Sequence, residues 1–304
     1  MSLSQVEAVE TKIEHPEEAR GGLARDAVRR LRRSPTAIVG AILVSIFVLV
    51  AIFAPLLAPY DPVAADLSQI RPGQFPGPSS EHLLGLDQQG RDEFSRIIYG
   101  ARYSLIIGIV SVTIGASVGI FLGLVAGAFG GGVDSLVMRL SDIMLAIPGL
   151  LLAIGIAALL GRSLTSVMIA IGVVNIPVFA RLLRGAMLSQ RESDYALAAR
   201  SLGVKRWRIV LQHVFPNSLA PVIVQATLAL ATAIIDAAGL AFLGLGSPDP
   251  SIPEWGRMLA ETNSFLASAP LLALWPGLAI VVSVLGFYLL GEALREALDP
   301  KLRR

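Results

Sequence analysis

The chain has 304 residues, of which 54% are hydrophobic and 16% charged, and one soluble core of this size cannot bury that much apolar surface. It contains no cysteine and three histidines that lie far apart, which excludes disulfides and thiolate chemistry and leaves no expected metal site. The 25 Lys and Arg residues give a net charge of +2 and are spread along the chain, so the composition favours an integral membrane protein without a nucleic-acid partner.

Six long apolar segments separated by charged residues predict six transmembrane helices, because each is long enough to cross the hydrocarbon core of a bilayer. None shows the strict alternation of a membrane β-barrel strand, so we expect an all-α integral membrane protein. In chain order, the predicted spans cover about 36–58, 103–129, 137–160, 163–183, 217–243 and 270–291.

Residues 1–33 precede the first span and are expected to form a tail, and residues 34–304 to form one membrane domain. The composition of the tail predicts an acid-rich, disordered segment over 1–24, followed by a basic amphipathic stretch. The first apolar segment is longer than the core of a cleaved signal peptide, so we interpret it as a retained membrane anchor.

Lys and Arg residues indicate which ends of the spans face the cytoplasm. Most of the chain's 25 basic residues lie in the tail, between spans four and five, and at the C-terminal end. Both termini are therefore expected to be cytoplasmic. This orientation requires an even number of spans and agrees with the prediction of six.

Four glycines recur at every fourth position of the second span, so they share one face of a helix. They are Gly115, Gly119, Gly123 and Gly127. Because glycine has no side chain, a neighbouring backbone can approach closely, and this glycine stripe is expected to face protein rather than lipid. It fits either a sliding interface between moving helices or ordinary helix packing, and the sequence leaves both open.

The stretch 181–217, between the fourth and fifth spans, is too long to be a simple connection. Ser189 and Glu192 have the spacing of a capping box and predict the start of a short helix, which Gly203 is placed to end. A second helical run then leads to Pro216, where we expect a break before the fifth span. Such a helix suits docking on another protein or lying at the membrane surface, and periodicity does not separate the two.

Polar residues inside the spans are candidate pathway positions, because a charge in the hydrocarbon core is costly. Asp236 in the fifth span is expected to face a polar cavity or a partner, or to make a structural hydrogen bond. Asn175, just before Pro177, is either a cavity residue or part of a plain kink. Two local ion pairs are expected near the cytoplasmic ends of spans three and six, Arg139 with Asp142 and Glu292 with Arg295.

Within the stretch 181–217, the order of small residues, glycine and proline resembles the EAA loop of ABC importer permeases, E-A-A-x3-G-x9-I-x-L-P. The matching positions are Ala198-Ala199, Gly203 and, after Phe215, Pro216. The chain departs from the motif where Leu197 stands in place of Glu and His213 in place of Ile, and Phe215 stands at the position of its Leu.

Other strings resemble the C-type permease of the dipeptide, oligopeptide and nickel family, whose signature reads H-x-x-G-T-D-x-x-G-R-D…S-R…Y-G-A-R. The segment 82–92 matches its first part, with Leu86 in place of Thr, and Ser95-Arg96 and the segment 99–102 match the rest. Later strings keep the family's order: FLGLG at 242–246, WGRML at 255–259, PG at 276–277 and LDP at 298–300. The similarity runs from about residue 25 to the C-terminus.

This resemblance implies a type I ABC importer permease in the plasma membrane of a bacterium or archaeon, and not an enzyme. It implies as partners a second, homologous permease, two ATPases and an extracytoplasmic binding protein. ATP and Mg²⁺ would be bound by the ATPases and no cofactor by this chain, which has no G-x4-G-K-[ST] phosphate loop. The loop that couples to an ATPase would include Asp194, Tyr195, Ala198, Ala199, Gly203 and Pro216.

The favoured function is therefore transport of peptides or similar small solutes into the cytoplasm, with the cargo itself left open. A self-contained proton-coupled transporter would show paired acids within the membrane and an inverted repeat. A membrane hydrolase would show clustered catalytic side chains. The sequence has a single deep acid, Asp236, and no such cluster, so it disfavours both alternatives.

Overall fold

The computed structural model describes residues 28–69 and 75–298. Within these ranges the chain is built from helices, and β-structure is limited to isolated bridges, Ala65 with Arg91 and Leu86 with Asp92. The predicted disordered segment 1–24 and most of the predicted tail lie outside the described residues. The α-helices are α3 (Pro35–Leu57), α4 (Glu93–Phe129), α5 (Gly131–Ala146), α6 (Gly149–Leu160), α7 (Leu164–Arg191), α8 (Asp194–Ser201), α9 (Arg206–Ile209), α10 (Phe215–Asn217), α11 (Ala220–Phe242), α12 (Trp255–Thr262) and α13 (Pro270–Leu298).

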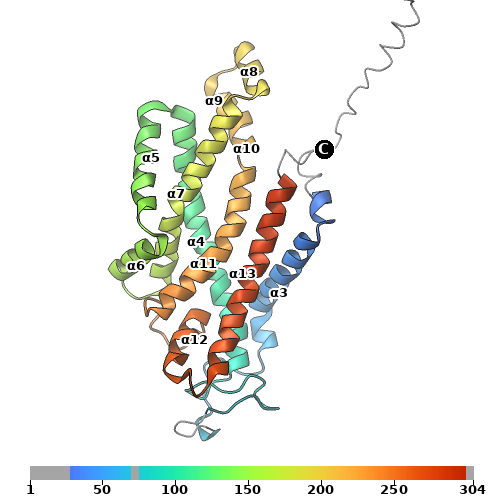
Figure 1. The fold of residues 1–304 in the computed structure, drawn as a ribbon, viewed down its shortest axis with the longest axis vertical. Coiled ribbons are helices and arrows are strands. Elements are labelled where there is room, and N and C mark those ends of the chain that lie inside the picture. Colours follow the sequence, from blue (N-terminus) through green and yellow to red (C-terminus); the bar gives the residue numbers. More distant parts are fainter. Residues whose placement is uncertain (1–27, 70–74, 299–304) are drawn as a thin grey trace, which may run out of the picture.

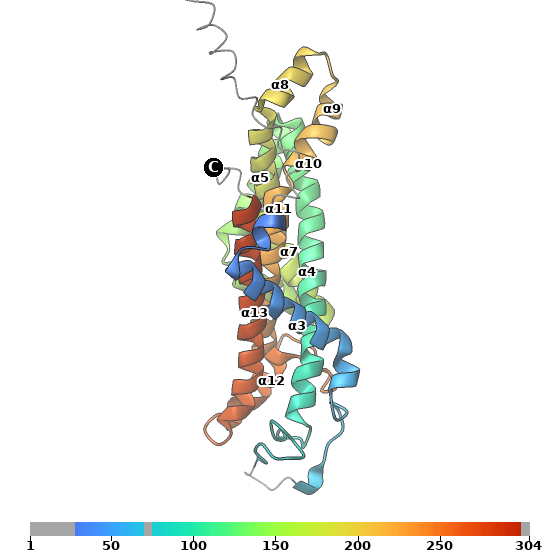
Figure 2. The same cartoon turned by 90° about the vertical axis from the view of Figure 1, so that its right-hand side faces the viewer.

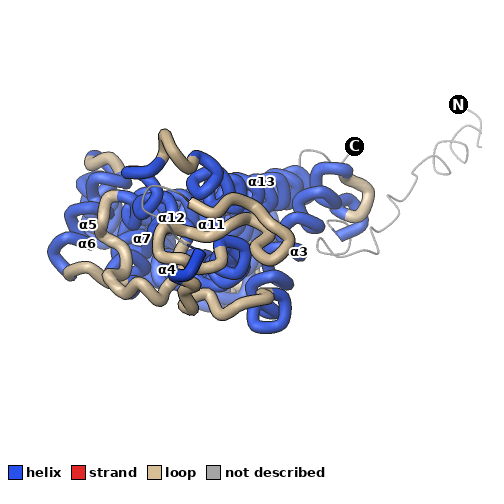
Figure 3. The backbone as a smooth tube through the Cα atoms, turned by 90° about the horizontal axis from the view of Figure 1, so that it is seen from below, coloured by secondary structure: helices blue, strands red, loops and turns tan. Residues whose placement is uncertain are grey.

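Five of these helices, α3, α4, α7, α11 and α13, are long and apolar enough to cross a membrane, and the bent pair α5–α6 makes six if it counts as one span. The predicted all-α membrane fold is confirmed. The long helices follow the long axis of the molecule, with α8 and α9 at one end and α12 near the other (Figure 1). Turned by 90°, α3 crosses the bundle at an angle (Figure 2). Seen from below, α3 and the α5–α6 pair lie at opposite edges of the bundle (Figure 3).

The predicted third span is divided into two helices. α5 ends at Ala146, α6 begins at Gly149, and the chain bends by 93° between them. Pro148 causes the break, because it has no N–H for the helix ladder and favours an extended conformation at Ile147, which has φ −92° and ψ 131°. The 12 residues of α6 span about 18 Å, less than the hydrocarbon core of about 30 Å.

α4 is longer than its predicted span. It has 37 residues, or about 55 Å, and begins at Glu93 rather than near residue 103. Asp92 sets this start, because its carboxylate accepts a hydrogen bond from the backbone N–H of Ser95 at 2.8 Å. Since about 55 Å exceeds the hydrocarbon core, the first, charged turns of α4, up to Arg102, extend beyond the membrane on the side of α12.

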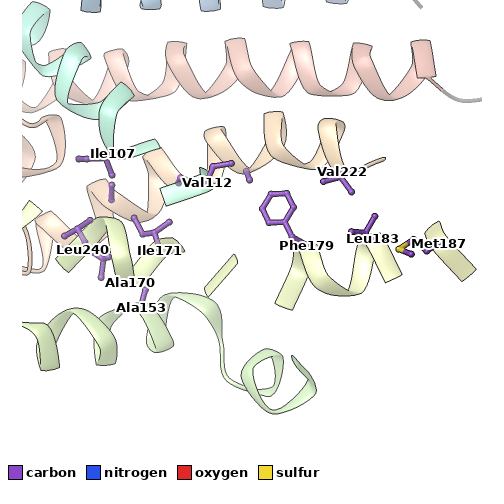
Figure 4. Close-up of a cluster of buried hydrophobic side chains, with 14 of the residues drawn as sticks. Ile107, Val112, Ala153, Ala170, Ile171, Phe179, Leu183, Met187, Val222 and Leu240 are labelled. Carbon is purple, nitrogen blue, oxygen red and sulfur yellow. The ribbon is translucent and has the colours of Figure 1, made fainter. Parts of the chain in front are cut away.

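Two apolar clusters hold the helices together. The larger joins α4, α7 and α11, and its fully buried side chains include Ile107, Phe179 and Leu183 (Figure 4). The smaller packs α3 and α13 against α12, where the ring centroids of Phe47 and Trp255 lie 5.6 Å apart. The other side of α3 stays exposed and apolar, as expected of a helix that faces lipid.

Candidate functional site

The glycine stripe of α4 is buried against α7. A β-carbon added at Gly119 would lie 2.5 Å from the β-carbon of Phe179 and 2.6 Å from the carbonyl oxygen of Ile176. Real β-carbons do not come so close to other atoms, so the two backbones meet at a distance that glycine permits and larger residues do not. Gly172 of α7 repeats the arrangement from the other side, since its added β-carbon would lie 2.8 Å from that of Ile114.

α8 occupies the middle of the loop between α7 and α11, from Asp194 to Ser201. The predicted helix start at Ser189 is wrong. α7 runs on to Arg191, so Ser189 belongs to its last turns and Glu192 is the residue at its C-terminal cap. The segment 186–191 contains neither proline nor glycine, and the established helix therefore continues past the capping pattern.

Gly203 terminates α8, as the sequence predicts, and lies two residues after Ser201, the last residue of the helix. Gly203 has φ +75°, a left-handed conformation that glycine adopts at little cost. Its N–H donates to the carbonyl oxygen of Arg200 at 2.9 Å, and the N–H of Val204 donates to that of Ala199 at 3.1 Å. These two bonds form a Schellman motif, which fixes the direction of the chain after α8.

The outer surface of α8 and α9 carries bulky apolar side chains among charged ones. Leu197, Leu202 and Trp207 are 44%, 83% and 54% exposed, whereas Ala196 is fully buried and anchors α8 in the larger apolar cluster. Four of the predicted coupling residues lie on α8. Three of them are exposed, namely Asp194, Tyr195 and Ala198, and the fourth, Ala199, is half-buried. Bulky apolar side chains with small residues between them allow another protein to approach closely.

Pro216 does not end the helical run that precedes it, and the prediction of a break at this residue is wrong. The run 206–217 passes through a π turn, Val210–Val214, in which the N–H of Phe215 donates to the carbonyl oxygen of Val210. The π turn shifts the helical hydrogen-bond pattern by one residue. Pro216, which has no N–H to donate, follows directly after it and belongs to the helical run. The break comes at 218–219, directly before α11.

Two arginines fasten this loop to the end of the glycine stripe. The guanidinium of Arg191 donates to the carbonyl oxygen of Gly127 at 2.9 Å, and that of Arg206 donates to the carbonyl oxygen of Ala128 at 2.7 Å. Cations at the C-terminal end of α4 also interact favourably with the helix dipole. The loop and the α4–α7 contact are therefore connected by direct bonds.

The two predicted pathway residues lie in different surroundings. Asp236 is half-buried on α11. Asn175 is buried between α7 and α4, and its side-chain amide donates to the carbonyl oxygen of Ile171, one turn earlier, at 2.9 Å. That bond stays within α7 and favours the structural interpretation of Asn175 over the cavity interpretation. A pathway role for either residue stays a prediction.

Ion pairs link α5 to α7. Asp142 pairs with Arg181 rather than with Arg139, so the predicted pair along α5 is wrong. α5 and α7 lie side by side, and the nearest cation comes from the neighbouring helix rather than from the same one. Arg184 also binds Asp134 through two hydrogen bonds, at 2.8 and 2.6 Å. The other predicted local pair is confirmed at 3.4 Å: Glu292 and Arg295.

A groove of about 700 Å³ opens beside α8, between α7, α11 and α13. Its walls are mostly apolar, and its polar groups are amides, a phenol and a guanidinium: Gln190, Asn217, Gln225, Tyr195 and Arg295. The hydroxyl of Tyr195 donates to Oε1 of Gln190 at 2.7 Å. Apolar walls with a few convergent polar groups suit a small polar solute. Neither Asp236 nor Asn175 lines this groove.

At the opposite end, a ring of four charges, three of them buried and Glu261 half-buried, joins the start of α4 to α12. Nε of Arg91 lies 2.6 Å from Oδ2 of Asp87, and Nη2 of Arg91 lies 3.0 Å from Oε2 of Glu261. Arg96 lies 3.4 Å from the same oxygen of Asp87 and 3.5 Å from that of Glu261. Arg257 adds a third cation, because its Nε lies 2.7 Å from Oε1 of Glu261, so three arginines surround the two acids of the ring.

The sequence motifs contain three of the four residues of this ring. Asp87, Arg91 and Arg96 belong to the string that resembles a family signature, but Glu261 lies 170 residues after Arg91 and in no motif that we recognised. A contact at that separation leaves no trace in local periodicity.

Two further glutamates near this ring are buried without complete hydrogen bonding. One carboxylate oxygen of Glu93 and both of Glu254 have no partner among the described atoms. Burial, together with the negative charge of Asp87, raises the pKa of Glu93 to about 8. Burial likewise raises the pKa of Glu254 to about 7. Both carboxyls therefore hold a proton well above the pH at which an exposed glutamate releases it.

Comparison with known proteins gives the family of this chain. Residues 119–304 match the family model described as binding-protein-dependent transport system inner membrane component. The chain belongs to this family. A second model, described as the N-terminal TM domain of oligopeptide transport permease C, matches residues 22–76 of this binding-protein-dependent permease.

Several named permeases are similar over most of their length. The dipeptide transport system permease protein DppC of Alkalihalophilus pseudofirmus is 49% identical over 280 residues, which cover 92% of this permease and 90% of that protein. The glutathione transport system permease protein GsiD of Pectobacterium atrosepticum is 42% identical, with 92% and 91% covered. The probable D,D-dipeptide transport system permease protein DdpC of Escherichia coli is 41% identical, with 89% of each chain covered.

The fold of this permease is similar to a chain from a structure described as an inward-facing conformation of the MetNI methionine ABC transporter. The TM-score is 0.55 at 18% identity, and the match covers 67% of this permease and 96% of that chain. Family, relatives and fold together identify a multi-pass permease subunit of an ABC importer, which is a transport protein and not an enzyme. The resemblance predicted from the EAA-like loop and the 82–102 strings is confirmed.

Proposed function

We propose that this permease moves peptides or similar small solutes into the cytoplasm, and that α8 couples the movement to separate ATPase subunits. The observation that carries the proposal is the set of large apolar side chains that α8, α9 and the link between them expose, on a loop bonded to the α4–α7 contact. The proposal includes a second homologous permease, two ATPases that bind ATP and Mg²⁺, and an extracytoplasmic binding protein, in the plasma membrane of a bacterium or archaeon.

In this mechanism α8 lies in a groove on an ATPase. Leu197, Leu202 and Trp207 supply apolar area for that contact, and Ala198 allows the two surfaces to approach closely. ATP binding draws the two ATPases together, and α8 moves with them. Because Arg191 bonds the end of α7 to the end of α4, the movement reaches these two helices as a rigid-body displacement.

Peptides are the cargo class that the relatives favour. The three similar permeases reported above are named for dipeptides, glutathione and D,D-dipeptides, all of which are short chains joined by amide bonds. The amide side chains in the groove between α7, α11 and α13 can exchange hydrogen bonds with such a backbone without selecting its side chains. Selection among peptides would then rest with the binding protein.

The variant Ala198→Arg tests the coupling, because it puts a long charged side chain on an exposed position of α8. We expect ATPase co-purification to fall at least about tenfold, which corresponds to the loss of one well-packed contact, while the permease stays in the membrane at its normal level. Ala267→Arg is the matched control, since Ala267 is also exposed but lies in the loop between α12 and α13. Full ATPase association and peptide uptake in Ala198→Arg would refute the role of α8.

Purification from native membranes tests the proposed partners. The tagged chain would be isolated in mild detergent and the proteins that accompany it identified by mass spectrometry. A second permease and ATPases near equal stoichiometry support the proposal. A chain that purifies alone or as a homo-oligomer, from membranes that contain such subunits, contradicts it.

A further inference from the structure

Four arginines lie at the start of the described chain, and we refer to them as the arginine cluster: Arg29, Arg30, Arg32 and Arg33. They belong to a helical turn that ends at Ser34, whose N–H donates to the carbonyl oxygen of Arg30 at 3.1 Å. Three of them are exposed and Arg30 is half-buried. Among the described residues, none of the four has a salt-bridge partner. The cluster is therefore a compact positive patch without a described counter-charge.

α3 places this patch at the surface of the membrane. The exposed apolar side of α3 extends from Ile38 to Leu56, a distance of about 27 Å, which is close to the hydrocarbon thickness of about 30 Å. Arg33 stands directly before Ser34, the N-cap of α3, so the arginine cluster adjoins the end of this apolar side. The headgroup layer, about 5–7 Å deep, begins where the hydrocarbon core ends. The arginine cluster is therefore placed beside the layer of lipid phosphates.

Among the described residues, two hollows lie against the cluster. A hollow of about 410 Å³ lies against Arg29, Arg32 and Arg33, and none of its described lining residues is acidic. A smaller hollow, of about 210 Å³, lies between Arg30 and the end of α13, where Glu296 lines it. In Figure 1 the dark blue turn of the cluster lies beside the red C-terminal end of α13. The three exposed guanidiniums thus face a hollow that is large enough for a phosphate group.

We propose that the arginine cluster binds the headgroups of anionic phospholipids, in the leaflet on the side of α8, with an acyl chain along the exposed side of α3. A guanidinium binds a phosphate through two parallel hydrogen bonds and keeps its charge at every physiological pH. The positive patch and the apolar side follow one another along the chain, which matches a molecule that is charged at one end and apolar along the rest. A zwitterionic lipid is disfavoured, because its own cation faces the patch.

Photo-crosslinking in nanodiscs tests the site. The chain would be purified in mild detergent with the subunits that accompany it and returned to phosphatidylcholine nanodiscs. These would contain a small fraction of photoactivatable phosphatidylglycerol or, in parallel, photoactivatable phosphatidylcholine. Mass spectrometry of peptides then gives the labelling yield on α3, with the yield on α6 as an internal reference for contact with bulk lipid.

We expect phosphatidylglycerol to label α3 more than phosphatidylcholine does. The triple variant Arg29→Gln, Arg32→Gln, Arg33→Gln should lower the phosphatidylglycerol yield on α3 at least about fivefold, since one basic residue near an anionic lipid surface contributes about that factor. The corresponding triple lysine variant keeps the charge and should keep most of the yield, and labelling of α6 should not change in either variant.

Four outcomes would overturn the proposal. Equal labelling of α3 by both lipids would show that charge does not select the lipid, and so would an unchanged yield in the glutamine variant. Absence of labelling by either lipid would show that another subunit covers this side of α3. A preference for phosphatidylglycerol that emerges only when residues 1–19 are deleted would show that the glutamates of this segment bind the arginines in place of the lipid.

Discussion

Adding a single methyl group to the glycine stripe tests whether the close approach of α4 and α7 is required. In Gly119→Ala, the new β-carbon would lie 2.5 Å from the β-carbon of Phe179, whereas ordinary contact begins at about 3.4 Å. The helices must therefore separate by about 1 Å at this point. Gly185→Ala is the matched control, because an added β-carbon on this exposed side of α7 meets nothing within 4 Å.

The separation has a calculable cost. A gap of 0.5–1 Å forfeits about a quarter to a half of the dispersion energy of each contact along the seam, and overpacking of this kind typically costs about 1–3 kcal/mol. For a chain of this size, about 2–4 °C of melting temperature is lost per kcal/mol. Gly185→Ala should instead be neutral or stabilise α7 by up to about 1 kcal/mol, because alanine loses less backbone entropy than glycine in a helix.

Thermal melting of the detergent-solubilised chain, followed through a fused fluorescent reporter on a sizing column, measures both variants against the unchanged protein. We expect Gly119→Ala to melt lower by several degrees and Gly185→Ala to melt at or above the reference. Equal melting temperatures for the two variants would refute the argument from backbone distance, and the stripe would then be an ordinary lipid-accessible face.

Three other perturbations have expected results. Arg91→Ala leaves the buried Asp87 with Arg96 as its one remaining ion-pair partner among the described residues, so it should lower the free energy of unfolding by about 3–5 kcal/mol, and a melting temperature within two degrees of the reference would contradict the ring. Glu93 keeps its proton up to a pH of about 8 in the folded chain but only to about 4.5 when unfolded, so stability should fall as the pH rises across this window. Glu93→Gln should flatten that fall in melting scans, and a parallel slope would contradict the pKa assignment. Alanine variants of Asp134 and Arg184, alone and together, should give a coupling energy of about 0.5–1 kcal/mol in a double-mutant cycle, because the pair is only partly buried; simple additivity would argue against it.

The apolar run lengths predicted five of the six membrane spans as continuous helices, and their order, because a bilayer leaves the backbone few alternatives to a helix. They did not predict where α4 begins. Run length treats Arg96 and Arg102 as the end of a span, whereas the helix continues outward because Arg96 is neutralised by Asp87 and Glu261. They also did not predict the break at Pro148, because an isolated proline inside an apolar run does not show whether the helix kinks slightly or is divided into two.

In the loop between α7 and α11, the sequence again predicted some features and missed others. Gly203 predicted the end of α8 because the signal is local: a residue that accepts φ +75° at the right distance from a helix start. The first residue of α8 depends on where α7 ends, and the capping pattern at Ser189 gives no information about that end. The bonds from Arg191 and Arg206 to the end of α4 join parts of the chain 64 and 78 residues apart, and only the folded arrangement brings them together.

The corner between α5 and α6 has a consequence for how the chain is synthesised. α6 is too short to cross a bilayer, and α5 carries Asp134, Arg139 and Asp142, each of which a translocon admits to the bilayer centre at a cost of about 2.5–3.5 kcal/mol. The arginines that neutralise the two aspartates, Arg184 and Arg181, leave the ribosome 50 and 39 residues later. Residues 131–160 therefore reach their final position only after most of α7 has been translated, and these helices enter the lipid as a group rather than one by one.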